Sequence, residues 1–250
     1  MNLSLLRQLL PALLPLVLGA CSSTSRISMV VPAPLTGTAP LEVERKQGFK
    51  HSYRFGDFAT TSVRPGWLTT STRSSNLRWL APVWFDQTRA RRKFSFTMQP
   101  ATGEVWQVQG AYYAWSEDLT VTPNTRVTTG ITLNQEDVYS SVIQGPGQTW
   151  QLLLESQSQL GDRPQFAQGT LSNGDSVLQV RPLSQLLRKD GRPMNLPFGV
   201  PVGYEFRRPN GSVVAAVELM GRGRVWLAPG LAPALQAPVA AAVTAMLMRD

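Results

Sequence analysis

The chain has 250 residues, of which 42% are hydrophobic and 16% charged, a balance typical of globular proteins and not of disordered or fibrous chains. Its formal net charge is +8, so its surface favours anionic partners such as phospholipid headgroups, lipopolysaccharide phosphates or acidic glycans. Cys21 is the only cysteine, which excludes a disulfide within the chain.

The amino terminus has the pattern of a secretory signal peptide, and we predict that residues 1–20 are removed on export. A short start that carries Arg7 is followed by an apolar stretch over residues 9–18 and then by small residues. This stretch is too short to cross a bilayer, which takes about 20 apolar residues, and Pro11 and Pro15 interrupt it. Export argues against nucleic acid as a partner.

Leu18-Gly19-Ala20-Cys21 ends this stretch and resembles the lipobox of bacterial lipoproteins. In that family the cysteine thiol carries a diacylglyceryl group, cleavage occurs just before the cysteine, and the new amino group is usually acylated too. The resemblance therefore implies that a lipid anchor at Cys21 holds the chain on a membrane. It also implies an outer-membrane location, on the periplasmic or surface face, because Ser22 stands where inner-membrane lipoproteins usually have Asp. The alternative is an ordinary cleaved signal peptide with a chance cysteine after it.

Residues 21–40 differ in composition from residues 41–250. The first stretch is rich in Ser, Thr and Pro and has little apolar periodicity, which predicts a lipidated flexible tether. From Leu41 onward the pattern is mainly that of β-strands, which predicts a single β-rich domain. The expected strands, in chain order, are 93–98, 104–109, 149–154, 176–180, 203–207, 212–219 and 224–227.

Turn sequences between these strands predict antiparallel hairpins. Pro100-Ala101-Thr102-Gly103 separates the first two expected strands. Ser172-Asn173-Gly174-Asp175 contains the Asn-Gly pair typical of tight hairpins, and Pro209-Asn210-Gly211 contains a second such pair.

The end of the chain changes to a helical pattern, which we predict over residues 231–249. Residues 231–248 contain no charge, and from Val239 the only polar interruption is Thr244. A helix that is apolar on all sides must be buried on every side or lie in a membrane, and this one is too short to span. The predicted fold class is therefore mainly β, an antiparallel barrel or sandwich with a buried apolar C-terminal helix. A second, shorter helix is expected over residues 183–189, ended by Asp190-Gly191.

The last part of the chain contains Asn210-Gly211-Ser212-Val213-Val214-Ala215, an Arg/Gly linker, Val225-Trp226-Leu227 and the final helix. Together these features resemble the tubby-like barrel. That fold is shared by the plant LURP-one proteins and the phospholipid scramblases, and the resemblance covers residues 41–250. It implies a closed antiparallel sheet around the helix and a binding role, because members typically recognise anionic phosphoinositides through basic residues. No residue of that site can be carried over to this chain. The alternative is an unrelated β-sandwich with a helix packed on one face.

The sequence assigns no catalytic residue, metal or cofactor. His51 is the only histidine and none follows Ser176, so Asn173-Gly174-Asp175-Ser176 is a turn and not the serine block of a GDSL-type lipase. A zinc site of the His/Cys kind lacks ligands. The pairs Glu117-Asp118 and Glu136-Asp137 do not have the spacing of a calcium-binding loop.

The main enzymatic alternative is a carboxylate-dependent glycan hydrolase, which needs only two suitably spaced acids. Spacing in the sequence does not select the pair. The candidates are Glu42, Glu44, Asp57, Glu104, Glu117, Asp118, Glu136, Asp137, Glu155, Glu205 and Glu218.

Basic residues supply the candidate binding site. Arg89, Arg91, Arg92 and Lys93 place four cations in five residues, and Arg188-Lys189 with Arg192 forms a second, looser group. Guanidinium groups bind phosphate and carboxylate groups through paired hydrogen bonds, so the first group is predicted to bind an anionic ligand. The alternative is a solvated loop that orients the domain at an anionic leaflet.

Tryptophans are divided between core and surface by their neighbours. Trp106, Trp150 and Trp226 lie in strand patterns with apolar neighbours and are expected in the core. Trp67 and Trp115 are expected to be more exposed.

These features favour a membrane-anchored envelope lipoprotein that acts as a non-enzymatic binding or structural component for an anionic envelope ligand or a protein partner. The alternatives are the glycan hydrolase and a lipid-binding barrel that encloses an acyl chain. A cleft with two carboxylates about 5–10 Å apart would indicate hydrolysis. An apolar cavity would indicate lipid carriage, and an exposed apolar patch beside the arginines would indicate a protein partner.

Overall fold

The computed structural model describes residues 27–46, 51–76, 83–124, 127–159, 167–188, 190–196 and 200–248, without the side chains of residues 122–129. Cys21 and the predicted signal peptide lie outside the described residues. The strands are β1 (Ser28–Met29), β2 (Leu41–Glu42), β3 (Glu44–Lys46), β4 (Ser52–Phe55), β5 (Phe58–Arg64), β6 (Thr69–Asn76), β7 (Val83–Pro100), β8 (Trp106–Asn124), β9 (Val127–Gly145), β10 (Gln148–Gln159), β11 (Gln168–Ser172), β12 (Val177–Leu183), β13 (Gln185–Leu187), β14 (Pro193–Asn195), β15 (Gly203–Arg207), β16 (Val213–Glu218) and β17 (Arg224–Leu227). The helices are the 3-10 helix η2 (Ala33–Leu35) and α1 (Pro233–Leu247).

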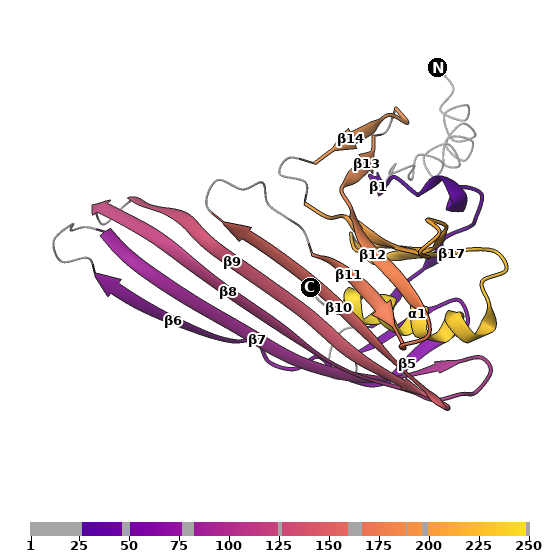
Figure 1. Cartoon of the computed structure of the whole chain (residues 1–250). Helices are drawn as coiled ribbons and strands as arrows, with labels where there is room; N and C mark the ends of the chain where they lie inside the picture. The colour runs from indigo at the N-terminus through magenta and orange to yellow at the C-terminus, as the bar shows by residue number, and fades with distance from the viewer. Residues whose placement is uncertain are drawn as a thin grey trace, which may run out of the picture.

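One 14-stranded antiparallel sheet forms most of the fold (Figure 1). Apart from β13 and β14, strands from β7 to β17 follow the same order in space as in sequence, so most connections are hairpins, as the turn sequences predict. The two ends of the sheet, β2 and β3, are consecutive in the chain and separated only by the buried Val43. The N–H of Val43 donates to the carbonyl oxygen of Gly223 at 3.2 Å. The sheet is therefore a nearly closed barrel, and the predicted mainly β fold class is confirmed.

Helix α1 fills the interior of the barrel and confirms the predicted buried C-terminal helix. All residues from 237 to 247 are buried. The small side chains of Ala240, Ala241 and Ala242 let the sheet approach the helix closely, while Trp106 and Trp150 fill the remaining space in the same core. The hydroxyl of Tyr139 donates to the carbonyl oxygen of Ala245, near the helix end, and the same oxygen accepts from the N–H of Met248 at 3.1 Å.

Strands β7, β8 and β9 are longer than the helix can cover. They contain 18, 19 and 19 residues, which corresponds to about 60 Å at about 3.3 Å per residue. The 15 residues of α1 extend over only about 22 Å. The remaining parts of these strands project from the barrel together with β6 (Figure 1). We call this projection the extension; it comprises β6 and residues 83–93, 111–124, 127–140 and 153–159.

One face of the extension continues the barrel interior, and we call it the inner face. This face changes from apolar to polar at one row of paired residues. That row is Arg92, Tyr112, Tyr139 and Leu154. On the barrel side of the row the same face carries the buried Phe94, Phe96, Val108, Ile143, Trp150 and Leu152. Beyond the row it carries Ala90, Ala114, Asp137, Ser156, Thr88, Ser116, Gln135 and Ser158. The extension therefore has no apolar core on this face.

Residues 27–36 pack on the outside of the barrel. Met29 and Leu35 are buried in a second apolar cluster with Trp226, and β1 joins β13 and β14 in a three-stranded sheet. The N–H of Met29 donates to Oε1 of Glu218 at 2.7 Å, and Nε of Arg224 donates to Oε2 at 2.6 Å. The second hydrogen bond raises the pKa of Arg224 above its ordinary value. Part of the stretch predicted as a flexible tether, residues 21–40, thus belongs to the packed structure.

The short helix predicted over residues 183–189 is wrong. Leu183 ends β12, and residues 185–187 form β13, which pairs with both β1 and β14. Leu186 is buried in the outer cluster, whereas Gln185 and Leu187 are exposed. This alternation is that of a strand with one buried face, and a three-residue strand is too short for the period to be evident in sequence.

Glu218→Gln is expected to loosen the N-terminal segment. The buried carboxylate accepts from both Met29 and Arg224, and loss of its charge should lower the free energy of unfolding by about 1–3 kcal/mol. Urea unfolding measures this change, and amide exchange at residues 28–30 should accelerate. Glu104→Gln, at an exposed carboxylate, is the control. Unchanged exchange at β1 would show that Glu218 does not hold the segment.

Candidate binding surface

The four cations of the predicted anionic-ligand site lie in strand β7 and not in a loop. Because side chains alternate along a strand, Arg89, Arg91 and Lys93 point to the outer face of the extension, opposite the inner face. All three are exposed. Arg92 is half-buried and belongs to the inner-face row with Tyr112. The structure thus brings three of the four predicted residues together and places the fourth on the other face.

Strand register places aromatic side chains beside the outer-face cations. Arg91 pairs with Tyr113 and Arg89 pairs with Trp115 on β8. Tyr113 is 39% exposed and Trp115 is half-buried. Trp115 is therefore more exposed than the core tryptophans Trp106, Trp150 and Trp226, as expected from the sequence.

Apolar side chains continue across the same outer face. Tyr113 pairs with the half-buried Val138. In the next row of the sheet, Lys93 on β7 is followed by Ala111 on β8, Ser140 on β9 and Leu153 on β10. Three apolar side chains on this face are at least 39% exposed: Tyr113, Ile131 and Leu153. The outer face is therefore an exposed apolar surface with cations along its β7 side.

The loop before β6 adds an exposed tryptophan near the edge of this surface. Gly66 lies against the backbone of Lys93, so closely that a Cβ atom at Gly66 would be 1.6 Å from the carbonyl oxygen of Lys93. Its φ of +68° also favours glycine. Trp67 follows and is 92% exposed, which confirms the expectation from sequence. Thr69 then pairs with Arg91, so the loop runs alongside the cations.

The carboxylates of the inner face are engaged in hydrogen bonds between strands. Thr120 donates to Asp86 at 2.7 Å, Thr132 donates to Asp118 at 2.6 Å, and the hydroxyl of Tyr112 donates to Asp137 at 3.3 Å. Strand alternation separates the two acidic pairs of the sequence, since Glu117 and Glu136 lie on the outer face. Among the described residues, no group of three or more His, Cys, Asp or Glu side chains is close enough to hold a metal ion.

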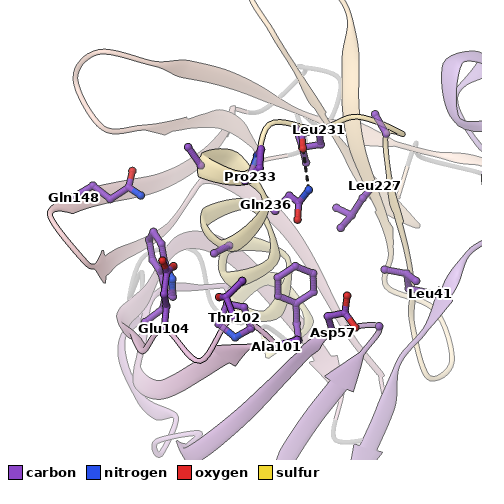
Figure 2. A pocket seen from close by; sticks show the side chains of 17 residues that line it. Leu41, Asp57, Ala101, Thr102, Glu104, Gln148, Leu227, Leu231, Pro233 and Gln236 are labelled. Atoms are coloured by element: carbon purple, nitrogen blue, oxygen red, sulfur yellow. Dashed lines mark hydrogen bonds between the residues drawn. The ribbon is translucent and has the colours of Figure 1, made fainter.

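A cavity of about 490 Å³ lies at the mouth of the barrel, beside the first turn of α1. Asp57 and Glu104 are two of its lining residues, and Figure 2 shows them on different sides, with Thr102 between them in the view. The amide of Gln236 closes part of the rim by donating to the carbonyl oxygen of Leu231 at 2.9 Å. Sequence spacing could not select this pair, because the two acids come from turns that meet only through the pairing of β5 with β7.

The Asn-Gly-Asp-Ser block forms a hairpin turn. Asn173 Oδ1 accepts from the backbone N–H groups of Asp175 and Ser176, which confirms the turn and explains why the Asn-Gly-Asp-Ser block is present. His51 is half-buried just before β4. Trp106, Trp150 and Trp226 are buried, as expected.

No protein-family model matches the chain. No curated protein and no solved structure shows significant similarity to it either. Within the part of the chain that the structure describes, no helix has the length and apolar character needed to cross a membrane. We therefore infer function from the surfaces of the molecule itself.

Proposed function

We propose that the chain is a membrane-anchored envelope lipoprotein, held by acyl chains on Cys21, that acts as a non-enzymatic binding component for a protein partner. The observation that carries the binding role is the outer face of the extension, where the exposed Tyr113 pairs with Arg91 and the exposed Leu153 lies two strands further along the sheet, on β10. Contiguous exposed apolar side chains with charged neighbours are typical of protein interaction sites. The anchor is supported by the lipobox-like Leu18-Gly19-Ala20-Cys21.

The charge distribution favours a protein over a simple polyanion. Cations occupy the β7 side of the outer face, whereas Glu136 and Glu155 occupy the β9 and β10 side. A polyanion lying across the sheet would meet these carboxylates. A protein with acidic groups opposite β7 can avoid that repulsion and cover the apolar residues between the two sides.

Photo-crosslinking in the native envelope tests this binding role. A photoreactive residue at Tyr113, on the outer face, should give a discrete cross-linked product, while one at Ala114, on the inner face, should not. Arg89→Glu/Arg91→Glu should reduce the product at least tenfold, because each reversed charge at an interface costs on the order of 1 kcal/mol or more. The control is Arg54→Glu/Arg222→Glu, at exposed arginines outside the extension. Equal products from both positions, or none from Tyr113, would contradict the proposal.

A carboxylate-dependent glycan hydrolase is the second candidate, because Asp57 and Glu104 share one cavity. Loss of glycan turnover in Asp57→Asn and in Glu104→Gln, with wild-type stability, would favour this candidate over a binding role. The lipid-carrier alternative has less support, because α1 occupies the interior where an acyl chain would lie. The nearly closed sheet around a C-terminal helix supports the tubby-like resemblance. We propose that the chain shares this fold, but we do not propose that it binds the phosphoinositide ligands of that family.

A further inference from the structure

We propose that the β13–β14 hairpin and the start of β1 form the surface with which the anchored domain contacts anionic phospholipid headgroups. This inference rests on the proposed lipid anchor at Cys21 and adds the orientation of the domain to it.

Residues 28 and 29 are held at a fixed point on the barrel. Met29 is 1% exposed, and its N–H is held by the buried Glu218. The next residue toward the amino terminus, Ser28, pairs with Leu187 of β13. Only residues 22–26 separate Cys21 from Ile27, so the two residues can be at most about 22 Å apart even in a fully extended chain. A lipid anchor at Cys21 therefore keeps this side of the barrel next to the membrane.

Side chains around this point have the chemistry of a membrane-surface contact. Ile27 is 56% exposed and Leu187 is 38% exposed. The turn that follows Leu187 carries Arg188 and Arg192, both exposed. Among the described residues, neither arginine takes part in a salt bridge.

The hairpin turn is held in one shape by its own backbone. The N–H of Arg188 donates to the carbonyl oxygen of Arg192 at 2.9 Å, and that of Gly191 donates to the carbonyl oxygen of Arg188 at 3.0 Å. Asp190 accepts from the N–H of Arg192 at 3.1 Å. These hydrogen bonds bring the two arginines together at the tip of the hairpin.

Anionic headgroups fit this surface better than another protein does. Arginine pairs with phosphate groups through two hydrogen bonds, and apolar side chains beside the cations can enter the boundary between headgroups and acyl chains. The membrane is also the one partner that the short tether brings to this side. The hairpin and β1 lie together at one side of the barrel, whereas the free ends of β6, β7 and β8 lie far from them at the end of the extension (Figure 1). The proposed orientation leaves the outer face of the extension open to a partner.

The test uses the full-length lipidated protein in vesicles of phosphatidylethanolamine and phosphatidylglycerol that contain a headgroup-level nitroxide quencher. Because Cys21 is the only cysteine and would carry lipid, Leu187→Cys takes a fluorescent label at a single site. Val177→Cys is the matched control: Val177 is 39% exposed and begins β12, at the other end of that strand from the hairpin. The Leu187 label should be quenched several-fold more strongly than the Val177 label.

Charge reversal provides the second measurement. Arg188→Glu/Arg192→Glu should lower quenching of the Leu187 label to the level of the Val177 label, because each cation strengthens binding to an anionic leaflet about fivefold. Arg89→Glu/Arg91→Glu changes the net charge equally on the extension and should leave the quenching unchanged. Both double variants alter exposed side chains, and their urea unfolding midpoints check that they fold.

Vesicle flotation separates failure of this inference from failure of the anchor. Protein that floats, but with equal quenching at Leu187 and Val177, overturns the hairpin surface and leaves the anchor in place. Protein that does not float overturns the anchor and the hairpin surface with it.

Discussion

Ala241→Glu is expected to prevent folding. Ala241 lies at the centre of α1 with none of its surface exposed, between the equally buried Ala240 and Ala242. A glutamate there has no room between helix and sheet, and no cation is among the residues of the surrounding core cluster. Burial of an unpaired carboxylate, together with overpacking, costs about 5 kcal/mol or more, which is comparable with the whole stability of many domains. Circular dichroism and limited proteolysis measure the loss.

The matched control places the same residue in the same helix. Ala234→Glu lies at an exposed position in the first turn of α1, where a negative charge interacts favourably with the helix dipole. Its unfolding midpoint should be close to that of the wild type. A cooperatively folded Ala241→Glu protein would show that the helix is not enclosed by the sheet.

Cys21→Ala is expected to remove the protein from the membrane fraction. Two or more acyl chains anchor a protein stably, at about 0.8 kcal/mol per buried CH₂, and the side chains of the β13–β14 hairpin alone would not replace them. Intact mass should show acyl groups on a wild-type chain that begins at Cys21. The variant should lack this mass and appear in the soluble fraction.

Ser23→Ala is the control for the anchor, because it changes the same stretch of sequence without removing the thiol. It should keep the acyl mass and the membrane location. An unmodified, soluble wild-type protein would contradict the lipoprotein assignment and leave a diffusible secreted protein as the leading interpretation.

The two proposed surfaces give each part of the fold a separate task. The barrel, nearly closed by β2 and β3 around α1, contains the apolar core, and its outer cluster around Met29 would fix the direction of the proposed anchor. The extension is built differently, because its inner face exchanges apolar packing for hydrogen bonds such as that from Thr120 to Asp86. This exchange allows long strands to project beyond the helix without a core, and it leaves their outer face free for binding.

Local patterns were enough to predict much of the fold. The alternation of residues 93–98, the Asn-Gly turn at 173–174 and the apolar residues of the last helix each depend on neighbours in the sequence. For this reason the hairpins and the buried helix appear where they were expected. The same reasoning failed over residues 183–189, where three residues are too few to distinguish a strand from a helix.

Only long-range pairing established the barrel, the extension and the candidate surface. Closure depends on the pairing of β2 with β17, which are far apart in the sequence, and no local pattern encodes that pairing. The four cations of residues 89–93 looked like one cluster in sequence, but β-strand alternation puts Arg92 on the inner face and the others on the outer face. The apolar residues beside those cations, Tyr113 and Val138, come from β8 and β9. Strand register alone brings these residues next to the cations, because side chains on neighbouring strands meet only when the sheet forms.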